Sequence, residues 1–269
     1  MKPLVALAGV LFCFPSVFSF CQHIHSVKSS YGSMVRSSSS LACLVRPIVT
    51  LKLAVDSQGA VDDLSKGDSW RFTSSSSLDL VHRLRAVSDA VAVGSGTVLR
   101  DNPSLTVRRV ELPPGRSQPL RVVFDRRLRS PWGCSLLQDE YETQLFTSNE
   151  PSDALLMAME EGKYVDAVGT GLDGLIQALS TLKKRDGIEH LMVEGGPQLA
   201  KAFLEGKLVD RAIVVRAETV TFSEPVPSGI SGSDFTAAGL ERVDIDTSGE
   251  DTVECWTRPD LPWPGPSWP

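Results

Sequence analysis

Acidic residues are missing from the first 55 positions of this 269-residue chain, where the first carboxylate is Asp56. Before Arg46 the only charged side chains are Lys2, Lys28 and Arg36. Because the whole chain has 27 basic and 33 acidic side chains, the part from Arg46 onward has 24 (27 − 3) and 33, a net charge of −9. An acidic body excludes general nucleic-acid binding, which needs basic surface to neutralise phosphates. We therefore expect no nucleic-acid partner.

Cysteine is also scarce. The chain has five, at Cys13, Cys21, Cys43, Cys134 and Cys255, too few and too scattered for a disulfide framework or a zinc site. The H-x-E and P-C-x-x-C signature of zinc-dependent nucleobase deaminases is absent as well. We therefore predict no metal site and no deaminase activity.

Long apolar runs are limited to Leu4–Phe14, which is too short for a membrane span of about 20 residues. Lys2 before this run and small residues after it predict a signal peptide over 1–19, with a membrane anchor or an apolar helix as the alternative. Residues 20–45 are Ser-rich and basic, like a transit peptide, and Phe20 follows the expected cleavage site. This layout resembles the bipartite presequences of algae with secondary plastids. We expect the protein to be imported into a plastid and its mature form to contain no membrane segment. Secretion is the alternative.

From Arg46 onward, apolar β-branched runs alternate with segments of helical spacing. Strands are predicted over 48–55, 90–93, 120–124, 142–146, 165–168, 188–193 and 209–215. Helices are predicted over 78–87, 154–160, 172–183 and 198–205, and a further turn of helix is predicted to begin at Thr97. This alternation predicts an α/β fold with a largely parallel sheet. A long loop is expected over 56–77, a closing antiparallel hairpin over 240–245 and 253–256, and a disordered Pro-rich tail over 259–269.

Polar and glycine-rich clusters follow four predicted strands, at Ala54–Gly59, Gly94–Thr97, Asp125 and Glu194–Pro197. Ligands bind beyond the carboxyl ends of parallel strands. The two glycines of the last cluster let the backbone approach a ligand, and the helix start at Pro197 offers N–H groups to a phosphate. An ordinary tight turn is the alternative. Gly94–Thr97 begins like a dinucleotide fingerprint but lacks its third glycine.

Three cations stand out. Lys52 lies within a buried apolar strand, where a lone charge is costly, so its side chain either reaches an edge or lies at a polar site. Arg85 and Arg108 are candidate phosphate ligands because arginine binds phosphate through two hydrogen bonds, although solvated surface charges are the alternative.

Together, PIVTLKLA at 47–54, LRAVSDAVAVGSGTVLRDNPSLTVR at 84–108, LRVVFD at 120–125 and VEGGPQLAKAFLEGKLVD at 193–210 resemble one family. It is the reductase domain of riboflavin biosynthesis, which forms the C-terminal half of the bacterial deaminase–reductase and stands alone in fungi and archaea. The resemblance spans 46–258. It implies a dihydrofolate-reductase-like three-layer sandwich that is commonly dimeric, with NADPH as cofactor and a phosphorylated pyrimidine as substrate.

The resemblance also implies roles for individual residues. Positions that match the family's cofactor contacts are Ala54, Trp70, Thr97, Asp101, Gly196, Pro197, Gln198 and Leu199. Positions that match substrate contacts are Ser69, Arg85, Leu105, Arg108 and Glu194. Lys52 matches a lysine that reaches the pyrimidine and the ribosyl group, so Lys52 and Glu194 are the candidate catalytic proton relay.

The chemistry implied is transfer of a hydride from NADPH to C1 of the opened ribosylamine, which gives a ribityl chain. Because no deaminase signature is present, a separate deaminase must supply the substrate. We expect this to be 5-amino-6-(5-phosphoribosylamino)uracil. The alternatives are the 2,5-diamino-6-ribosylamino-pyrimidinone phosphate, another small imine or pterin, or a non-catalytic homologue that partners the deaminase.

The chain departs from the family pattern in several places. The usual Ser-x-Asp-Gly is Ser57-Gln58-Gly59, and the residue between Ser69 and Trp70 is missing. Arg126 replaces a serine after the strand that ends at Asp125, where it is a candidate partner for the 2′-phosphate of NADPH. The Pro-x-x-Gly segment expected after Val215 is unrecognisable. These departures bear on substrate geometry and on activity.

Overall fold

The computed structural model describes residues 45–66, 71–153, 156, 159, 161–265 and 268–269. The predicted signal peptide, nearly all of the transit-peptide-like segment, most of the helix expected over 154–160, and the site residues Ser69 and Trp70 lie outside these ranges. No helix in the described ranges is long and apolar enough to cross a membrane.

The strands are β1 (Ile48–Asp56), β2 (Ala60–Asp63), β3 (Ala90–Gly94), β4 (Leu120–Phe124), β5 (Thr143–Thr147), β6 (Lys163–Ala167), β7 (His190–Glu194), β8 (Arg211–Ala217), β9 (Pro225–Pro227), β10 (Glu241–Ser248) and β11 (Asp251–Thr257). The helices are α1 (Ser75–Val87), α2 (Ser95–Asp101), α3 (Ser135–Gln138), α5 (Gly171–Lys184), α6 (Pro197–Glu205) and α7 (Gly232–Ala237).

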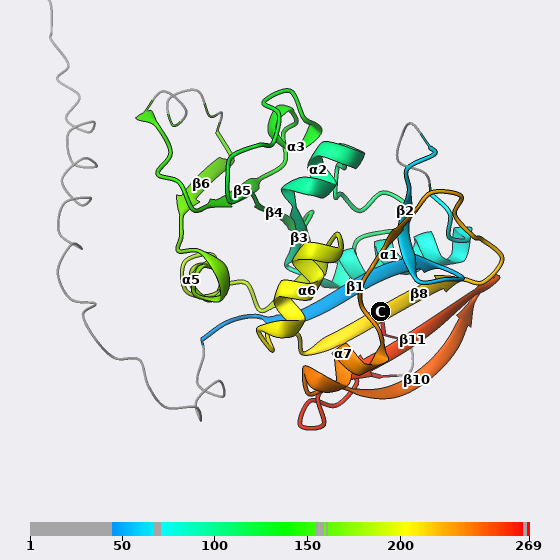
Figure 1. Ribbon diagram of the computed structural model, residues 1–269. Helices are drawn as coiled ribbons and strands as arrows, with labels where there is room; N and C mark the ends of the chain where they lie inside the picture. The colour runs from blue at the N-terminus through cyan, green and yellow to red at the C-terminus, as the bar shows by residue number, and fades with distance from the viewer. Residues whose placement is uncertain (1–44, 67–70, 154–155, 157–158, 160, 266–267) are drawn as a thin grey trace, which may run out of the picture. The chain divides into compact units, whose positions relative to one another are not determined.

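Nine of these strands form one sheet in the order β10-β11-β8-β1-β7-β3-β4-β5-β6 (Figure 1). From β8 to β6 every neighbouring pair is parallel. β11 pairs antiparallel with β8, and β10 pairs antiparallel with β11. The predicted parallel sheet and its closing antiparallel hairpin are both confirmed.

Helices cover both faces of this sheet. Leu179 of α5, Phe203 of α6 and Phe235 of α7 belong to one buried apolar cluster. Leu84 of α1, Val98 of α2 and Leu136 of α3 belong to the other. Alternate residues of a strand point to opposite faces, so Ala90 and Ala92 of β3 join the first cluster while Val91 and Val93 join the second. The expected three-layer α/β sandwich is confirmed.

Helix α1 begins earlier than the sequence pattern predicts. Ser74 is its N-cap, and the Ser74 hydroxyl accepts a hydrogen bond from Ser77 N–H at 3.2 Å. A serine that caps in this way satisfies one of the free N–H groups of the first turn. The run Ser74–Ser77, predicted as part of a loop, therefore starts the helix.

The segment 56–77 is not one uniform loop, as was predicted, because it contains β2. This strand pairs antiparallel with β9, with Ala60 opposite Pro227. Two buried aspartates fasten the surrounding turns. Asp56 accepts hydrogen bonds from the N–H groups of Gln58, Ala60 and Phe222, and Asp63 accepts from those of Ser65, Ser223 and Glu224. They tie the chain after β1 to the chain after β8.

The Pro-rich tail, for which composition predicts disorder, makes contacts in its described residues. Trp263 and Trp268 pack edge to face with ring centroids 5.0 Å apart, and both lie against a core cluster. The Arg211 guanidinium lies 5.4 Å from the centre of the Trp268 ring, a cation–π distance.

Candidate active site

The carboxyl ends of β1, β7, β3 and β4 lie side by side in the sheet. Lys52 of β1 is the register partner of Glu194 of β7, and Gly94 of β3 is the partner of Phe124 of β4. All four polar clusters predicted after strand ends therefore meet at one edge of the sheet. Such an edge is where parallel α/β sheets bind ligands.

Glu194 forms a buried ion pair with Arg85. The Arg85 Nε and Nη2 atoms donate to the two carboxylate oxygens at 2.5 and 2.7 Å, and the side chains are only 9% and 15% exposed. Arg85 Nη1 also donates to the Thr106 carbonyl at 3.1 Å. Burial alone would raise the pKa of Glu194, but the guanidinium of Arg85 and the nearby Lys52 hold that pKa below its usual range. The resemblance placed Arg85 at a phosphate, whereas here its guanidinium lies on a carboxylate.

Lys52 lies between Glu194 on β7 and Ile213 on β8. Burial lowers the pKa of Lys52, although the Glu194 carboxylate opposes this effect. The side chain of Lys52 makes no hydrogen bond or ion pair with any residue in the described part of the chain. A lysine with a lowered pKa releases its proton more readily near neutral pH, so Lys52 is suited to donate a proton.

A group of cations lies beside this pair. Partial desolvation and the charges of Arg71 and Arg85 lower the pKa of Arg108. Burial together with Arg85 and Arg108 lowers the pKa of His82 to about 4. Cations that depress one another's pKa values create a positive potential, which an anionic group bound between them would relieve. This corner of the site suits a phosphate or carboxylate.

The cations differ in how strongly they are held. Arg109 donates to the Asp79 carboxylate at 2.7 Å, so its charge is balanced. The Arg108 side chain bonds to the Ser104 hydroxyl, a neutral partner, and is exposed. Arg108 is therefore better placed than Arg109 to bind an incoming anion.

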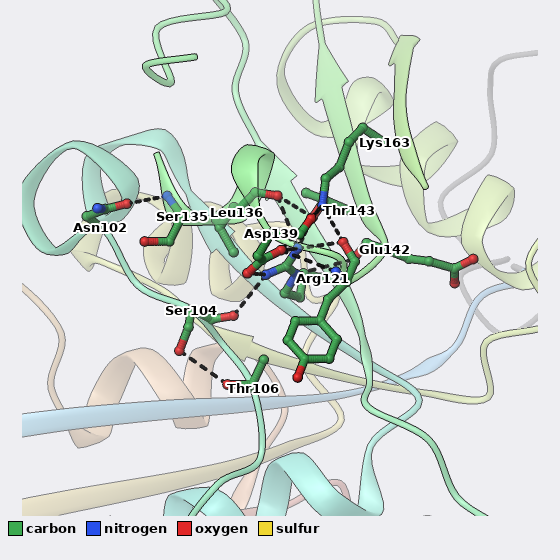
Figure 2. Close-up of polar contacts among 11 residues, drawn as sticks. Asn102, Ser104, Thr106, Arg121, Ser135, Leu136, Asp139, Glu142, Thr143 and Lys163 are labelled. Carbon is green, nitrogen blue, oxygen red and sulfur yellow. Dashed lines mark hydrogen bonds and ion pairs between the residues drawn. The ribbon is translucent and has the colours of Figure 1, made fainter. Parts of the chain in front are cut away.

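Residues 102–108, which we call the 102–108 loop, carry Arg108 into this corner. Leu105 is buried and has φ of +55°, in the left-handed region that a leucine rarely adopts. Such a conformation persists only where the surroundings fix it. Asn102 Oδ1 accepts from Ser135 N–H at 2.7 Å, and the Ser104 carbonyl accepts from Arg121 Nη1 at 3.3 Å. Figure 2 shows these contacts on one side of the loop.

Arg121 is the centre of a buried polar cluster that contacts the 102–108 loop through the Ser104 carbonyl. Its side chain is 1% exposed and donates twice to the Asp139 carboxylate at 2.6 Å and once to Thr143 Oγ1 at 2.7 Å (Figure 2). Lys163 Nζ donates to the Asp139 carbonyl at 2.7 Å. Arg121, Thr143 and Lys163 lie near the amino ends of β4, β5 and β6. The cluster is therefore at the edge of the sheet opposite the carboxyl ends of the strands, where the four polar clusters meet and which we call the ligand edge. Its role is structural.

The starts of α2 and α6 form a narrow cradle. A Cβ atom placed on Gly196 would lie 3.5 Å from Thr97 Oγ1, and one placed on Gly94 would lie 3.7 Å from Leu199 Cβ. The two helix starts are therefore close together, and each offers unpaired backbone N–H groups. Arg129 Nη2 donates to Ser95 Oγ at 2.9 Å, which adds a cation beside α2. These residues fit a dinucleotide, whose phosphates need close backbone approach and positive charge.

Residues 47–253 match the family model described as the RibD C-terminal domain. The chain belongs to the RibD C-terminal domain family. A relative named riboflavin biosynthesis protein RibD, from Aquifex aeolicus, is 31% identical over 79% of this chain and 58% of its own length. The 2,5-diamino-6-ribosylamino-4(3H)-pyrimidinone 5′-phosphate reductase of Archaeoglobus fulgidus is 33% identical over 71% of this chain and 89% of its own length.

A solved member of this family has the same fold. It is the Thermotoga maritima protein named as a diaminohydroxyphosphoribosylaminopyrimidine deaminase and 5-amino-6-(5-phosphoribosylamino)uracil reductase. Its TM-score is 0.64 at 25% identity, and the match covers 79% of this chain but 57% of that one. The chain thus spans a little more than half the length of its RibD relatives, and the resemblance to the riboflavin reductase family is confirmed.

The remaining family positions lie around the same edge. Ala54 is half-buried on β1 opposite Val215, and Asp101 is exposed at the end of α2. Gln198 is exposed beside Pro197, the first residue of α6, and Arg126 is exposed just after β4. Among the described residues, no three His, Cys, Asp or Glu side chains gather as metal ligands would.

Sequence reasoning missed two further side chains beside this edge, His82 and Arg129. His82 lies one helical turn before Arg85, so the i, i+3 spacing on α1 could have indicated that they share a face. Arg129 belongs to the run Arg126-Arg127-Leu128-Arg129, and this density of arginine directly after a strand end was the available signal.

Proposed function

We propose that this chain is an NADPH-dependent oxidoreductase of riboflavin biosynthesis that reduces the ribosyl group of 5-amino-6-(5-phosphoribosylamino)uracil to the ribityl group. The observation that carries the proposal is the position of Lys52 and Glu194, register partners at the ligand edge between the helix-start cradle and the cationic corner around Arg108. The Thermotoga maritima relative carries the same reductase activity in its name.

The cradle is the proposed NADPH site. Thr97, Gly196 and Pro197 hold the pyrophosphate through the two helix starts, and Gln198 and Leu199 continue that contact. Arg126 binds the 2′-phosphate that distinguishes NADPH from NADH, and Arg129, three positions later, adds a second positive charge. When bound, NADPH supplies the hydride that reduces C1 of the opened ribosylamine.

The protein's own residues orient the substrate and move a proton. Arg108 binds the substrate phosphate in the cationic corner. Glu194, held by Arg85, fixes the pyrimidine. As the C1=N bond gains a hydride at carbon, its nitrogen must gain a proton, and Lys52 Nζ donates it. Holding both partners in place supplies much of the rate enhancement.

The first experiment follows NADPH oxidation by the purified protein with the phosphoribosylamino-uracil substrate generated in situ by a deaminase. Oxidation that depends on this substrate supports the proposal. Faster oxidation with the diamino-pyrimidinone phosphate would favour that compound as the substrate instead. The match to 89% of the length of the Archaeoglobus fulgidus reductase, which is named for this compound, supports it as the second candidate. NADPH binding without turnover on either substrate would indicate another imine or pterin. Loss of NADPH binding as well would indicate a non-catalytic partner of the deaminase.

The phosphate assignment has its own test. In R108Q we expect the KM for the phosphorylated substrate to rise about 30-fold, the equivalent of about 2 kcal/mol for a lost charge-assisted contact. The KM for the dephosphorylated substrate should not change. An equal loss on both substrates would remove Arg108 from the phosphate site, and R83Q, on the same helix as Arg85 but not in the cationic corner, is the control.

We also propose that a separate deaminase supplies the substrate, because the sequence from Met1 to Pro269 carries no zinc deaminase signature. The protein is proposed to act as a homodimer, as the family resemblance implies. Light scattering coupled to gel filtration measures its mass in solution, and a monomer would contradict this assembly.

The plastid location is a further proposal that rests on the acid-free, Ser-rich composition of residues 1–45. A fluorescent protein fused after residue 45 should enter the plastid of an alga with secondary plastids. The same fusion starting at residue 20 should remain in the cytosol. Fluorescence in the medium would support secretion instead.

A further inference from the structure

The side chain of Gln118 brackets a single residue of the 102–108 loop. Val107 N–H donates to Gln118 Oε1 at 2.7 Å, and Gln118 Nε2 donates to the Val107 carbonyl at 2.9 Å. The two residues are 11 positions apart. One amide side chain thus satisfies both backbone polar groups of Val107, as a neighbouring strand would.

Gln118 is itself held firmly by its place in the chain. It precedes the buried Pro119, and a residue before proline is restricted to extended backbone. Strand β4 begins directly afterwards, and Leu120 N–H donates to the Asp89 carbonyl at 3.0 Å. Gln118 is therefore anchored to the sheet, so it can impose a position on Val107.

Val107 connects Leu105, the strained residue of the loop, to Arg108, the proposed phosphate ligand. On one side, the Thr106 carbonyl accepts from Arg85, the partner of Glu194. On the other side, Arg108 N–H donates to His82 Nδ1 at 3.1 Å. With Leu105 in the left-handed region, the loop depends on such contacts to keep its conformation. Release of Val107 would allow Arg108 to move while leaving the helix-start cradle untouched.

We propose that Gln118 is a positioning residue that sets the location of Arg108, and through it the affinity for the phosphate of the substrate. The inference rests on the proposed function, because it takes Arg108 as the phosphate ligand. Gln118 acts on substrate binding, and in the described part of the chain its side-chain hydrogen bonds go to Val107 and not to the helix-start cradle.

The test compares Q118A with wild type in the NADPH oxidation assay. We expect KM for the phosphorylated substrate to rise about tenfold, which corresponds to about 1.4 kcal/mol. The kcat and the dissociation constant of NADPH should stay within about twofold of wild type. With the dephosphorylated substrate, the KM of Q118A should be about equal to that of wild type, because Arg108 then has no anion to bind. A merely structural role would not produce this dependence on the phosphate.

Q118E provides a second readout that does not rely on deleting the side chain. An ionised carboxyl group accepts from Val107 N–H but cannot donate to the Val107 carbonyl, whereas the protonated form can do both. The KM of Q118E divided by that of wild type should therefore fall as the pH is lowered from 7 to 4, a range that spans the carboxyl pKa of about 4.3. Q138A is the matched control, since the exposed Gln138 also donates to a carbonyl, that of Trp132 at 2.8 Å.

The outcomes distinguish a failure of the proposed function from a failure of the proposed role of Gln118. If wild type shows no substrate-dependent oxidation, the proposed function is overturned, and the role of Gln118 with it. If wild type is active but folded Q118A keeps its KM, or loses affinity equally for both forms of the substrate, only the role of Gln118 is overturned. If Q118A does not fold, a pH-independent KM ratio in Q118E overturns it instead.

Discussion

Removing the charge of Glu194 tests the electrostatics of the site most directly. In E194Q the side chain keeps its size, but Arg85 is left buried without a counter-charge. Two unit charges about 4 Å apart attract by about 4 kcal/mol at an effective dielectric constant of about 20. Because the amide oxygen still accepts one hydrogen bond, we expect the free energy of unfolding to fall by about 2 kcal/mol, within the range for hydrogen bonds to charged groups. In E194L, which offers no acceptor, the loss should be about 3–5 kcal/mol.

The assay is urea unfolding followed by tryptophan fluorescence, with the midpoint and slope measured for each variant. E205Q is the matched control. Glu205 is 68% exposed and lies 3.9 Å from Lys201, so its pair should contribute less than about 1 kcal/mol. An E194Q protein as stable as E205Q would refute the view that the Arg85–Glu194 pair is formed and buried in the folded protein.

The same pair predicts a dependence on pH. The pKa of Glu194 is lower in the folded protein than in the unfolded chain, where it is about 4.3, so the folded state binds fewer protons below that value. Its stabilisation is complete above pH 4.3 and is lost as the pH falls through the folded pKa. The difference in unfolding free energy between wild type and E194Q should therefore shrink below about pH 4.

Three other predictions concern catalysis, pH and packing. K52M should lower kcat by about 10²–10⁴-fold, the usual contribution of a general acid, while the dissociation constant of NADPH changes less than about twofold, and K184M on the exposed end of α5 should behave as wild type. For His82, whose pKa falls from 6.5 to about 4 on folding, the unfolded state binds more protons between these values, so stability rises with pH across that interval; H82N should flatten the rise in a series of urea titrations. In G174A the new Cβ would lie 2.0 Å from the Gly169 carbonyl oxygen, so the melting temperature should drop by the equivalent of about 1–3 kcal/mol or more, whereas G96A, with open space around its Cβ, should lose far less.

The parts of the fold that the sequence predicts are those with a strong local signal. Apolar β-branched runs located the central strands to within a residue or two because a strand buried on both faces is apolar throughout. The Gly195-Gly196-Pro197 turn was equally clear, since Pro197 occupies the first position of α6. These signals were enough to predict that the polar clusters after the strands lie at one edge of the sheet.

The missed features depend on partners that are distant in the sequence. β2 has four residues and β9 has three with proline at both ends, so neither shows a periodicity of its own. The Arg85–Glu194 pair joins residues 109 positions apart, and each looked like an independent ligand contact. Arg121 was hidden inside an apolar strand pattern, and only the fold shows that Asp139 neutralises it.

The two edges of the sheet differ in how the charges of their cations are balanced. At the amino edge, Arg121 and Lys163 bind backbone carbonyls and Asp139, so each of these cations is satisfied by the protein itself. At the carboxyl edge, Glu194 balances Arg85, whereas among the described residues the Lys52 side chain has no hydrogen-bond or ion-pair partner and the exposed Arg108 side chain bonds to the Ser104 hydroxyl. Substitutions at Arg108 can therefore be made without touching the ion pairs that hold the fold. The anionic group bound at this corner can thus change while the buried ion pairs of the scaffold stay the same.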